Sequence, residues 1–337
     1  MSKSSFLRLM LRTARHLIDP IQPAEDARDP AAAGVKRVVP GRVSEITGFG
    51  SNPGELRMYV YTPAPRPPLN APLIVLLHGC GQDAADFAAQ AGWIGLADRI
   101  GAAILLPEQQ SGNSRGRCFN WFQPADVRRG RGEALSILQM VNAAAKRFGS
   151  DRSRVFIAGL SAGGAMTAAL LAAYPSVFSA GAIVAGMPVG VAQNLPMAVL
   201  RMRQSDPYKG REALAEAVRR SAPAHSKNIW PRVSIWQGGD DRIVDPGNAQ
   251  QLAAQWGAVH GLAEGSAVET QGLAPGVHHR TWGEVSRPQV ELWTLAGMGH
   301  GFPIDGTGKD GSQPGFAVLE AGISATDHIA RFWGLSG

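Results

Sequence analysis

The chain has 337 residues with a formal net charge of +6, and 45% of its residues are apolar while 18% are charged. This composition is that of an ordinary globular protein, and the absence of any 18-residue apolar run predicts no transmembrane segment. The two cysteines, Cys80 and Cys118, exclude a disulfide-dense scaffold and a four-cysteine zinc site. The basic residues are scattered without an accompanying aromatic stripe, so we expect no nucleic-acid partner.

The first 45 residues are predicted to lie outside the main domain. Arg8, Arg12 and Arg15 interrupt the apolar residues of the first twenty positions, whereas a secretory signal needs an uninterrupted apolar core. We therefore expect an amphipathic helix that packs on the domain or contacts an anionic surface. Residues 19–40 are rich in Ala, Pro and Asp and have no apolar period, which predicts a linker.

Short apolar strands alternate with helices in the rest of the chain. The predicted strands are residues 57–62, 73–77, 102–106, 155–158, 182–185, 233–237 and 290–295. The strand 290–295 is expected to be the last of the chain. The predicted helices are residues 86–99, 132–148, 165–173, 248–259 and 325–333. This alternation predicts a single α/β domain over residues 46–337, with a mostly parallel central sheet and helices on both faces.

The connections between these elements carry further expectations. Asp86 is expected to cap the first helix, and Pro107 to end the third strand. Residues 108–130 form a loop long enough to suggest a functional role. Residues 187–231 are a helix-rich insertion and a candidate cap over the site, while residues 261–288 are turn-rich and include a candidate hairpin. In such sheets the ligand binds beyond the carboxyl ends of the strands.

A serine at a sharp turn is the strongest functional signal. Residues 159–163 read Gly-Leu-Ser-Ala-Gly and lie between the predicted strand 155–158 and an Ala/Leu-rich helix. This is the strand–turn–helix context that the G-x-S-x-G nucleophile elbow requires, so Ser161 is the predicted nucleophile.

The acid that would orient a base for this serine is sought after a later strand, because the order serine, acid, histidine is typical of such hydrolases. Asp240, Asp241 and Asp245 all follow the strand 233–237. Asp245 precedes a proline at a helix start and is suited to an N-cap, while Asp240 is suited to shaping the turn. Asp241 is therefore the predicted acid.

His300 is the predicted base. It lies in a glycine-flanked loop, Gly-Met-Gly-His-Gly-Phe-Pro, directly after the strand 290–295. His78 precedes Gly79 and is expected to support its loop instead of transferring protons. The remaining histidines are expected in the tail, in polar loops or helix ends, and on the last helix: His16, His225, His260, His278, His279 and His328.

Backbone N–H groups are expected to stabilise the tetrahedral oxyanion that forms on the substrate. The N–H of Ala162 follows the nucleophile, and that of Cys80 lies in a glycine-rich loop after the strand 73–77. A nucleophilic Cys80 is the alternative, although no neighbouring base is evident. Cys80 and Cys118 follow strands at the same rim and can meet in a disulfide, or remain two free thiols. No cluster has metal-ligand spacing, so we expect no metal and no cofactor.

Six motifs occur in order: LHGCGQ (77–82), CFNWF (118–122), GLSAGGAM (159–166), YPSVFSAGAIVAG (174–186), WQGGDD (236–241) and GMGHGFP (297–303). Together they resemble the poly(3-hydroxybutyrate) depolymerase family of esterases over about residues 55–335. The resemblance implies an α/β-hydrolase fold with Ser161 as nucleophile, Asp241 as acid and His300 as base.

The resemblance also implies the residues around the triad. Cys80 is expected as the oxyanion-loop residue and in a disulfide with Cys118. Trp121 is expected to line the acyl pocket, with Asn120 and Gln82 of the same motifs as further substrate-binding residues. By this resemblance the protein is extracellular or periplasmic, and a cytoplasmic location is the alternative because no convincing signal peptide is present.

The predicted function is that of a serine carboxylester hydrolase that works through an acyl-enzyme. Polymer-degrading relatives add a polymer-binding domain, which this sequence lacks after Trp333, so we expect 3-hydroxybutyrate oligoesters or similar short-chain esters as substrates. Feruloyl or acetyl esters of plant polysaccharides are the alternative, as is acyl transfer to another alcohol. A non-catalytic binding protein on the same fold is the alternative from a different class. The oligomeric state is not predicted.

Overall fold

The computed structural model describes residues 43–64, 66–223, 229–270 and 273–335, so the predicted N-terminal helix and the whole of the predicted linker lie outside the described residues. The strands are β1 Val43–Ile46, β2 Arg57–Tyr61, β3 Leu73–Leu77, β4 Ala103–Glu108, β5 Val155–Leu160, β6 Ala180–Val184, β7 Arg232–Gly238, β8 Val268–Glu269, β9 Val277–Glu284, β10 Arg287–Leu295, β11 Phe302–Ile304 and β12 Val318–Glu320. The helices are α2 Ala84–Gln90, α3 Trp93–Ile100, α4 Pro124–Val127, α5 Gly132–Phe148, α6 Ala162–Ala173, α7 Leu195–Arg203, α8 Arg211–Ser221, α9 Gly247–Val259 and α10 Ala325–Trp333.

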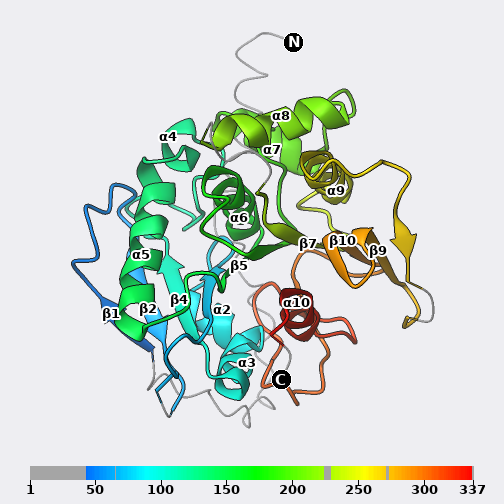
Figure 1. The fold of residues 1–337 in the computed structure, drawn as a ribbon. Coiled ribbons are helices and arrows are strands. Elements are labelled where there is room, and N and C mark those ends of the chain that lie inside the picture. The colour runs from blue at the N-terminus through cyan, green and yellow to red at the C-terminus, as the bar shows by residue number, and fades with distance from the viewer. Residues whose placement is uncertain (1–42, 65, 224–228, 271–272, 336–337) are drawn as a thin grey trace, which may run out of the picture.

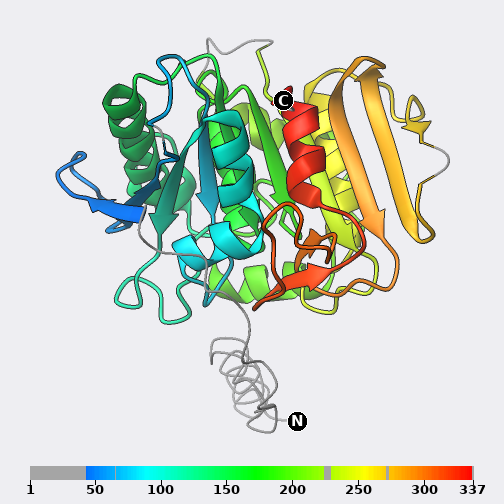
Figure 2. The same ribbon diagram turned by 90° about the horizontal axis from the view of Figure 1, so that it is seen from below.

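A central sheet separates two layers of helices (Figure 1). Within the described residues the sheet has ten strands in the order β1-β2-β4-β3-β5-β6-β7-β10-β9-β8. The six strands from β4 to β10 in this order pair in parallel, and antiparallel strands extend both ends. Figure 2 shows the blue β1 at one end of the sheet and the orange β9 near the other. The predicted α/β fold with a mostly parallel sheet is confirmed.

The buried strand β3 explains why the sheet needs helices on both faces. Leu73, Val75 and Leu77 belong to a core with α5, α6 and α9, whereas Ile74 and Leu76 belong to a core with α2, α3 and α10. Successive side chains of a strand point to opposite faces, so a strand covered on both sides is a continuous apolar run. Figures 1 and 2 show these two groups of helices on opposite faces of the sheet.

The structure corrects the predicted elements near the start of the domain. β1 begins at Val43, so the boundary predicted between residues 45 and 46 falls inside a strand. The single helix predicted for residues 86–99 is instead α2 and α3, because Gly92 takes a left-handed conformation with φ of 80° between them. Asp86 lies in the first turn of α2 and does not precede it.

Strand β4 continues through Pro107, which was expected to end it. The neighbouring β3 pairs with β4 only as far as Leu105, so beyond that point no strand on this side needs an N–H from β4. A proline is tolerated at such an edge position. β2 pairs with the other edge of β4 throughout.

The C-terminal part of the sheet is larger than predicted. The candidate hairpin is present as β9 and β10, and β10 begins at Arg287, three residues before the predicted start. It is not the last strand, because β11 and β12 follow it and pair with each other. His278 and His279, expected in polar loops or helix ends, lie on β9, where a β-branched and aromatic neighbourhood outweighs their polarity.

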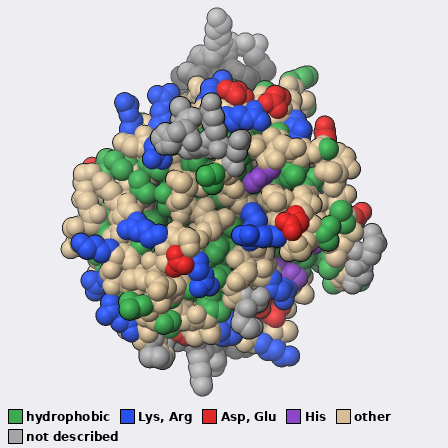
Figure 3. Space-filling view, in the orientation of Figure 1, with side chains coloured by type: hydrophobic (Ala, Val, Ile, Leu, Met, Phe, Trp, Pro, Cys, Tyr) green, Lys and Arg blue, Asp and Glu red, His purple; other side chains and the backbone are tan. Residues whose placement is uncertain are grey.

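Basic side chains are dispersed on the face of the molecule drawn in Figure 3, where they alternate with apolar and neutral side chains. No helix among the described residues is long and apolar enough to cross a lipid bilayer.

Candidate active site

The nucleophile elbow is a strand, one strained residue and a helix. β5 ends at Leu160, and Ser161 follows with φ of 57° and ψ of −117°, a conformation that few residues other than glycine adopt. The N–H of Ser161 donates to the carbonyl of Val184 on β6 at 2.9 Å. The turn is thereby held against the neighbouring strand, and its serine lies at the carboxyl end of β5.

Gly163 allows α6 to pack against the end of β3. A Cβ added at Gly163 would lie 2.2 Å from the carbonyl oxygen of Leu77 and 2.5 Å from that of His78. Both are backbone atoms, and all residues of α6 are buried, so neither side has room to move. The second glycine of the motif is therefore required by close approach of two backbones.

The predicted acid and the predicted base are brought together by the parallel pairing of β7 and β10, in which Gly238 lies opposite Leu295. Beyond this pair the two loops remain joined, since the N–H of Gly239 donates to Leu295 and that of Asp240 to Met298. A Cβ on Gly238 would lie 2.3 Å from the carbonyl oxygen of Gly299, so the loops touch through their backbones.

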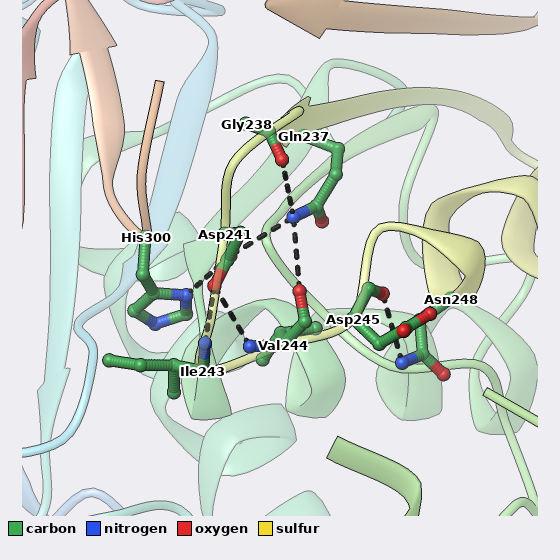
Figure 4. A network of polar contacts seen from close by, with 8 residues as sticks. All are labelled: Gln237, Gly238, Asp241, Ile243, Val244, Asp245, Asn248 and His300. Atoms are coloured by element: carbon green, nitrogen blue, oxygen red, sulfur yellow. Dashed lines mark hydrogen bonds and ion pairs between the residues drawn. The ribbon is translucent and has the colours of Figure 1, made fainter. Parts of the chain in front are cut away.

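Asp241 and His300 form a hydrogen-bonded pair at this place (Figure 4). His300 Nδ1 lies 2.7 Å from Asp241 Oδ2, and the Asp241 side chain is fully buried. The other oxygen, Oδ1, accepts hydrogen bonds from the N–H groups of Ile243 and Val244, and Gln237 Nε2 donates to Oδ2. Four groups therefore hold this carboxylate in one orientation toward the imidazole.

Burial alone would raise the pKa of Asp241, but the hydrogen bond and charge of His300 and the two backbone N–H groups overcome it and lower the pKa. The carboxyl is thus ionised at neutral pH. Asp245 instead accepts from the N–H of Gly247 at the start of α9, and Asp240 is exposed in the turn. Of the three aspartates, Asp241 is the one that contacts His300.

Ser161 lies in the wall of a cavity of about 100 Å³. The wall also includes Ala162, Cys80 and Trp121, which sequence reasoning had selected. It further includes residues that were not predicted: Phe122, Met187, Leu195, Ala198, Val199, Met202, Arg203, Ile243 and Val244. Four of these residues could have been identified from the sequence by their helical spacing, which places them on one face of α7: Leu195, Ala198, Val199 and Met202.

Two backbone N–H groups are available at the cavity. Ala162 is the first residue of α6, so its N–H has no acceptor within the helix. In the loop after β3, the N–H groups of Gly79, Gly81 and Gln82 all donate to other atoms of the protein. Among the described residues no acceptor takes the N–H of Cys80. These two groups are thus free to donate to a negatively charged oxygen.

Cys80 and Cys118 form a disulfide with a Cα–Cα distance of 4.3 Å. It joins the loop after β3 to the loop that carries Trp121. Because neither cysteine has a free thiol, the alternative of a nucleophilic Cys80 is excluded.

Gln82 and Asn120 are not part of the cavity wall, and their side chains are hydrogen-bonded to other parts of the protein. Gln82 Oε1 accepts from Gly79 N, and its Nε2 donates to the carbonyl of Phe316. Asn120 donates to Glu133 through both its backbone N–H and its side-chain amide. Their contact with substrate remains a prediction, whereas the structure assigns them to holding two loops of the site.

Glu133 is a buried carboxyl behind these loops. It accepts hydrogen bonds from Gln109 Nε2 and from Asn120, whose neighbour Trp121 lines the cavity. Burial raises the pKa of Glu133 to about 8, because the hydrogen bonds that favour the charged form offset the lost hydration only in part. Sequence reasoning did not identify this residue, since a glutamate in the first turn of a helix is ordinary.

His78 supports the loop after β3, as its position before Gly79 suggested. Its Nδ1 donates to the carbonyl of Gly79, and its Nε2 accepts from the N–H of Gln109. Burial lowers the pKa of His78 to about 4, so the ring is neutral at physiological pH. It therefore has no free nitrogen with which to transfer a proton.

One contact of a complete triad is not formed in the structure. Within the described part of the chain, Ser161 Oγ makes no hydrogen bond to His300. Such bonds are often long in proteins without substrate. No group of three His, Cys, Asp or Glu residues among those described is arranged to hold a metal ion.

A sequence profile of the family described as "Esterase PHB depolymerase" matches residues 56–274. The chain belongs to this esterase family. It is 38% identical over 298 residues to poly(3-hydroxyalkanoate) depolymerase C of Paucimonas lemoignei, which covers 88% of this chain and 70% of that protein.

Other esterases are similar to most of the chain. Feruloyl esterase B of Talaromyces funiculosus is 29% identical, over 80% of this chain and 75% of that protein. Acetylxylan esterase of Coprinopsis cinerea is 31% identical, over 79% of this chain and 71% of that protein. An acetyl xylan esterase structure from Aspergillus awamori has a TM-score of 0.74 at 23% identity and covers 87% of this chain and 99% of that one, which shows the shared fold. The protein is accordingly a carboxylic ester hydrolase.

Proposed function

We propose that the protein hydrolyses oligomeric or other short-chain esters of 3-hydroxybutyrate through an acyl-enzyme on Ser161. The observation that carries this proposal is the 2.7 Å hydrogen bond between Asp241 and His300. It lies next to the cavity, because Ile243 and Val244, which donate to Asp241, also form part of the wall that contains Ser161. A histidine held by a buried carboxylate is the base that a serine nucleophile needs.

Each residue has one role in the proposed reaction. Ser161 Oγ attacks the ester carbonyl while His300 takes its proton, and Asp241 keeps the proton on Nδ1 so that Nε2 acts as the base. The N–H groups of Cys80 and Ala162 donate to the oxyanion. The bond to the alcohol oxygen then breaks, the alcohol leaves with the proton from His300, and a water molecule releases the acid by the same steps.

Three features support a short hydroxyalkanoate as the acyl group. The cavity is small, and its wall is mainly apolar. The depolymerase relative is 38% identical, compared with 29% and 31% for the two polysaccharide esterases. Feruloyl esters are the second candidate, because Trp121 and Phe122 in the same wall can pack against an aromatic acyl group.

A mutant series tests the mechanism. Ser161→Ala, Asp241→Asn and His300→Gln are each expected to lower the kcat/KM for p-nitrophenyl butyrate by about 10³-fold or more. A fluorophosphonate should label Ser161, as read by peptide mass spectrometry. The matched controls are Asp240→Asn and His278→Gln, an aspartate and a histidine that are both exposed and outside the cavity wall. Retained turnover in Ser161→Ala would refute the mechanism.

A substrate panel tests the acyl group. The dimer and trimer of 3-hydroxybutyrate, methyl ferulate and acetylated xylan are compared by kcat/KM, with and without an added alcohol that would reveal acyl transfer. We expect the oligomers to be the best substrates. A preference for ferulate or acetylated xylan would replace the hydroxybutyrate assignment and leave the serine mechanism in place.

We also infer that the chain from Val43 onward acts as one catalytic domain, since β1 belongs to the main sheet, and that α7 forms part of a cap, since its face lines the cavity. An extracellular or periplasmic location is supported by the disulfide between Cys80 and Cys118, because disulfides persist in oxidising compartments. Fractionation of the source cells with an activity assay tests the location. Activity confined to the cytosol would contradict it.

A further inference from the structure

Helix α7 presents an apolar face to the cavity and ends in one cation. Leu195, Ala198, Val199 and Met202 line the wall at the spacing of one helical face, and Arg203 follows as the last residue of the helix. The face extends roughly 12 Å from Leu195 to Arg203, at 1.5 Å per residue. Among the described residues that form the wall, Arg203 is the charged one.

Arg203 has no polar partner among the residues that the structure describes. Its side chain is exposed, and no carboxylate of the described chain lies within ion-pair distance of it. Arg201, two residues earlier, differs, because it pairs with Asp206 at 2.7 Å and both side chains are largely shielded from solvent. One arginine of this turn is thus paired within the fold, whereas the other lies at an apolar cavity without an ion-pair partner in the described ranges.

We propose that Arg203 binds the terminal carboxylate of a hydroxyalkanoate oligomer, on the leaving-group side of the scissile ester. This inference rests on the proposed function. An oligomer of a hydroxy acid has a direction, since its hydroxyl end belongs to the acyl part that remains on Ser161, and its carboxylate end belongs to the alcohol that leaves. A guanidinium can bind such a carboxylate through two parallel hydrogen bonds.

The same assignment separates the substrate classes. An acetyl or feruloyl ester on a neutral sugar has no carboxylate for Arg203 to bind, whereas every soluble hydroxybutyrate oligomer has one. Because Arg203 is exposed, solvent weakens the interaction, and we expect a preference of about 3- to 10-fold for the carboxylate substrate. The preference should decrease in high salt, since screening acts strongly on exposed charges.

The test compares two substrates that contain a single ester bond. They are the dimer of 3-hydroxybutyrate with a free terminal carboxylate and the same dimer with a terminal carboxamide. The measured quantity is the ratio of their kcat/KM values, so a general loss of activity in a variant cancels. We compare the unaltered protein with Arg203→Gln, Arg203→Lys and, as the matched control, Arg220→Gln, whose side chain is 70% exposed on α8.

The ratio is expected to fall about 3- to 10-fold in Arg203→Gln, to be partly kept in Arg203→Lys and to be unchanged in Arg220→Gln. A favourable charge at the end of α7 is the competing explanation for Arg203. That role would lower the stability of the variant and leave the ratio as it was, which would overturn the inference while ester hydrolysis itself continues.

Two further outcomes are informative. If the unaltered protein hydrolyses neither dimer, the proposed function fails and this inference fails with it. If Arg203→Gln does not fold, the salt dependence in the unaltered protein decides. A ratio that stays constant between 0.05 and roughly 0.5 M NaCl would then overturn the inference, because the Debye length shrinks severalfold over this range.

Discussion

The two sides of the site are built in different ways. The nucleophile side is one contiguous stretch, in which β5, Ser161 and α6 follow each other directly. The acid–base side joins Asp241 and His300, which are 59 residues apart, through the parallel register of β7 and β10. The first geometry is therefore encoded by local sequence, whereas the second depends on how distant strands pair.

This difference predicts where a substitution acts. Gly163 belongs to the buried helix α6 and packs against the end of β3, so a change there affects folding. Gly238 is the buried last residue of β7 and faces the loop that leads to His300, so we expect a change there to act first on the position of His300.

Gly163→Ala should have the largest effect, a loss of about 3 kcal/mol or more in the free energy of unfolding. Its new Cβ would meet the backbone carbonyl oxygens of Leu77 and His78 at 2.2 and 2.5 Å. Urea denaturation measures the loss. Gly112→Ala is the control, because a Cβ there meets no atom within 4 Å. Equal stability of the two variants would contradict the packing argument.

The disulfide joins two loops that are distant in the sequence. Because Cys80 and Cys118 are separated by 38 residues, its removal should lower the free energy of unfolding by about 2–4 kcal/mol. The double variant Cys80→Ala/Cys118→Ala should also have a lower kcat/KM, because the oxyanion loop is no longer tied to the loop with Trp121. The unaltered protein in dithiothreitol should match the variant, and the variant should not respond to dithiothreitol. A response in the variant would show that the reductant acts elsewhere.

The raised pKa of Glu133 leads us to expect that the free energy of unfolding depends on pH. With its pKa raised to about 8, the folded protein holds a proton that the unfolded chain has released above about pH 4.5. The contribution of protonated Glu133 to the free energy of unfolding is complete below the pKa that this residue has in the unfolded chain. It is lost as the pH rises to and through the pKa of Glu133 in the folded protein, at up to about 1.4 kcal/mol per pH unit.

Three histidines act in the opposite direction at lower pH, and one of them is His260, whose pKa is lowered by burial. His78 and His328 have pKa values lowered to about 4, mainly by burial, so the unfolded chain takes up protons below about pH 6.5 while the folded protein does not. Glu133 is therefore measured by itself between about pH 6.5 and 8. As the pH rises over this range, the free energy of unfolding of the unaltered protein should decrease by about 2 kcal/mol, whereas that of Glu133→Gln should change little. Parallel pH profiles of the two proteins would rule out this assignment.

Gly238→Ala should have the smallest effect on folding and a distinct effect on catalysis. The added Cβ would displace the loop at Gly299, next to His300, and such a displacement costs about 10-fold or more in kcat/KM. Gly299→Ala is the spatial control, since its Cβ meets nothing within 4 Å. If Gly238→Ala destabilised the fold as much as Gly163→Ala, the two sides of the site would not differ as we describe.

Prediction from sequence failed where distant neighbours decide the local structure. Pro107 does not end β4, because β3 stops pairing with that edge at Leu105. His279, expected in a polar loop or at a helix end, lies on β9 with its ring stacked on Trp293 at 3.8 Å and hydrogen-bonded to Glu291. Gln82 and Asn120 were selected for their motifs, but their hydrogen bonds to Phe316 and Glu133 involve segments that no local pattern identifies.

The sequence by itself determined the alternation of strands and helices, the elbow around Ser161 and the candidates Asp241 and His300, because apolar periodicity, glycine positions and turn chemistry act over a few residues. The tertiary structure alone decided that Asp241 and not Asp240 or Asp245 contacts His300, that Cys80 is bonded to Cys118, and that a face of α7 ending in Arg203 lines the cavity. These contacts depend on strand register and on the packing of loops from distant parts of the chain, and neither is expressed in the order of neighbouring residues.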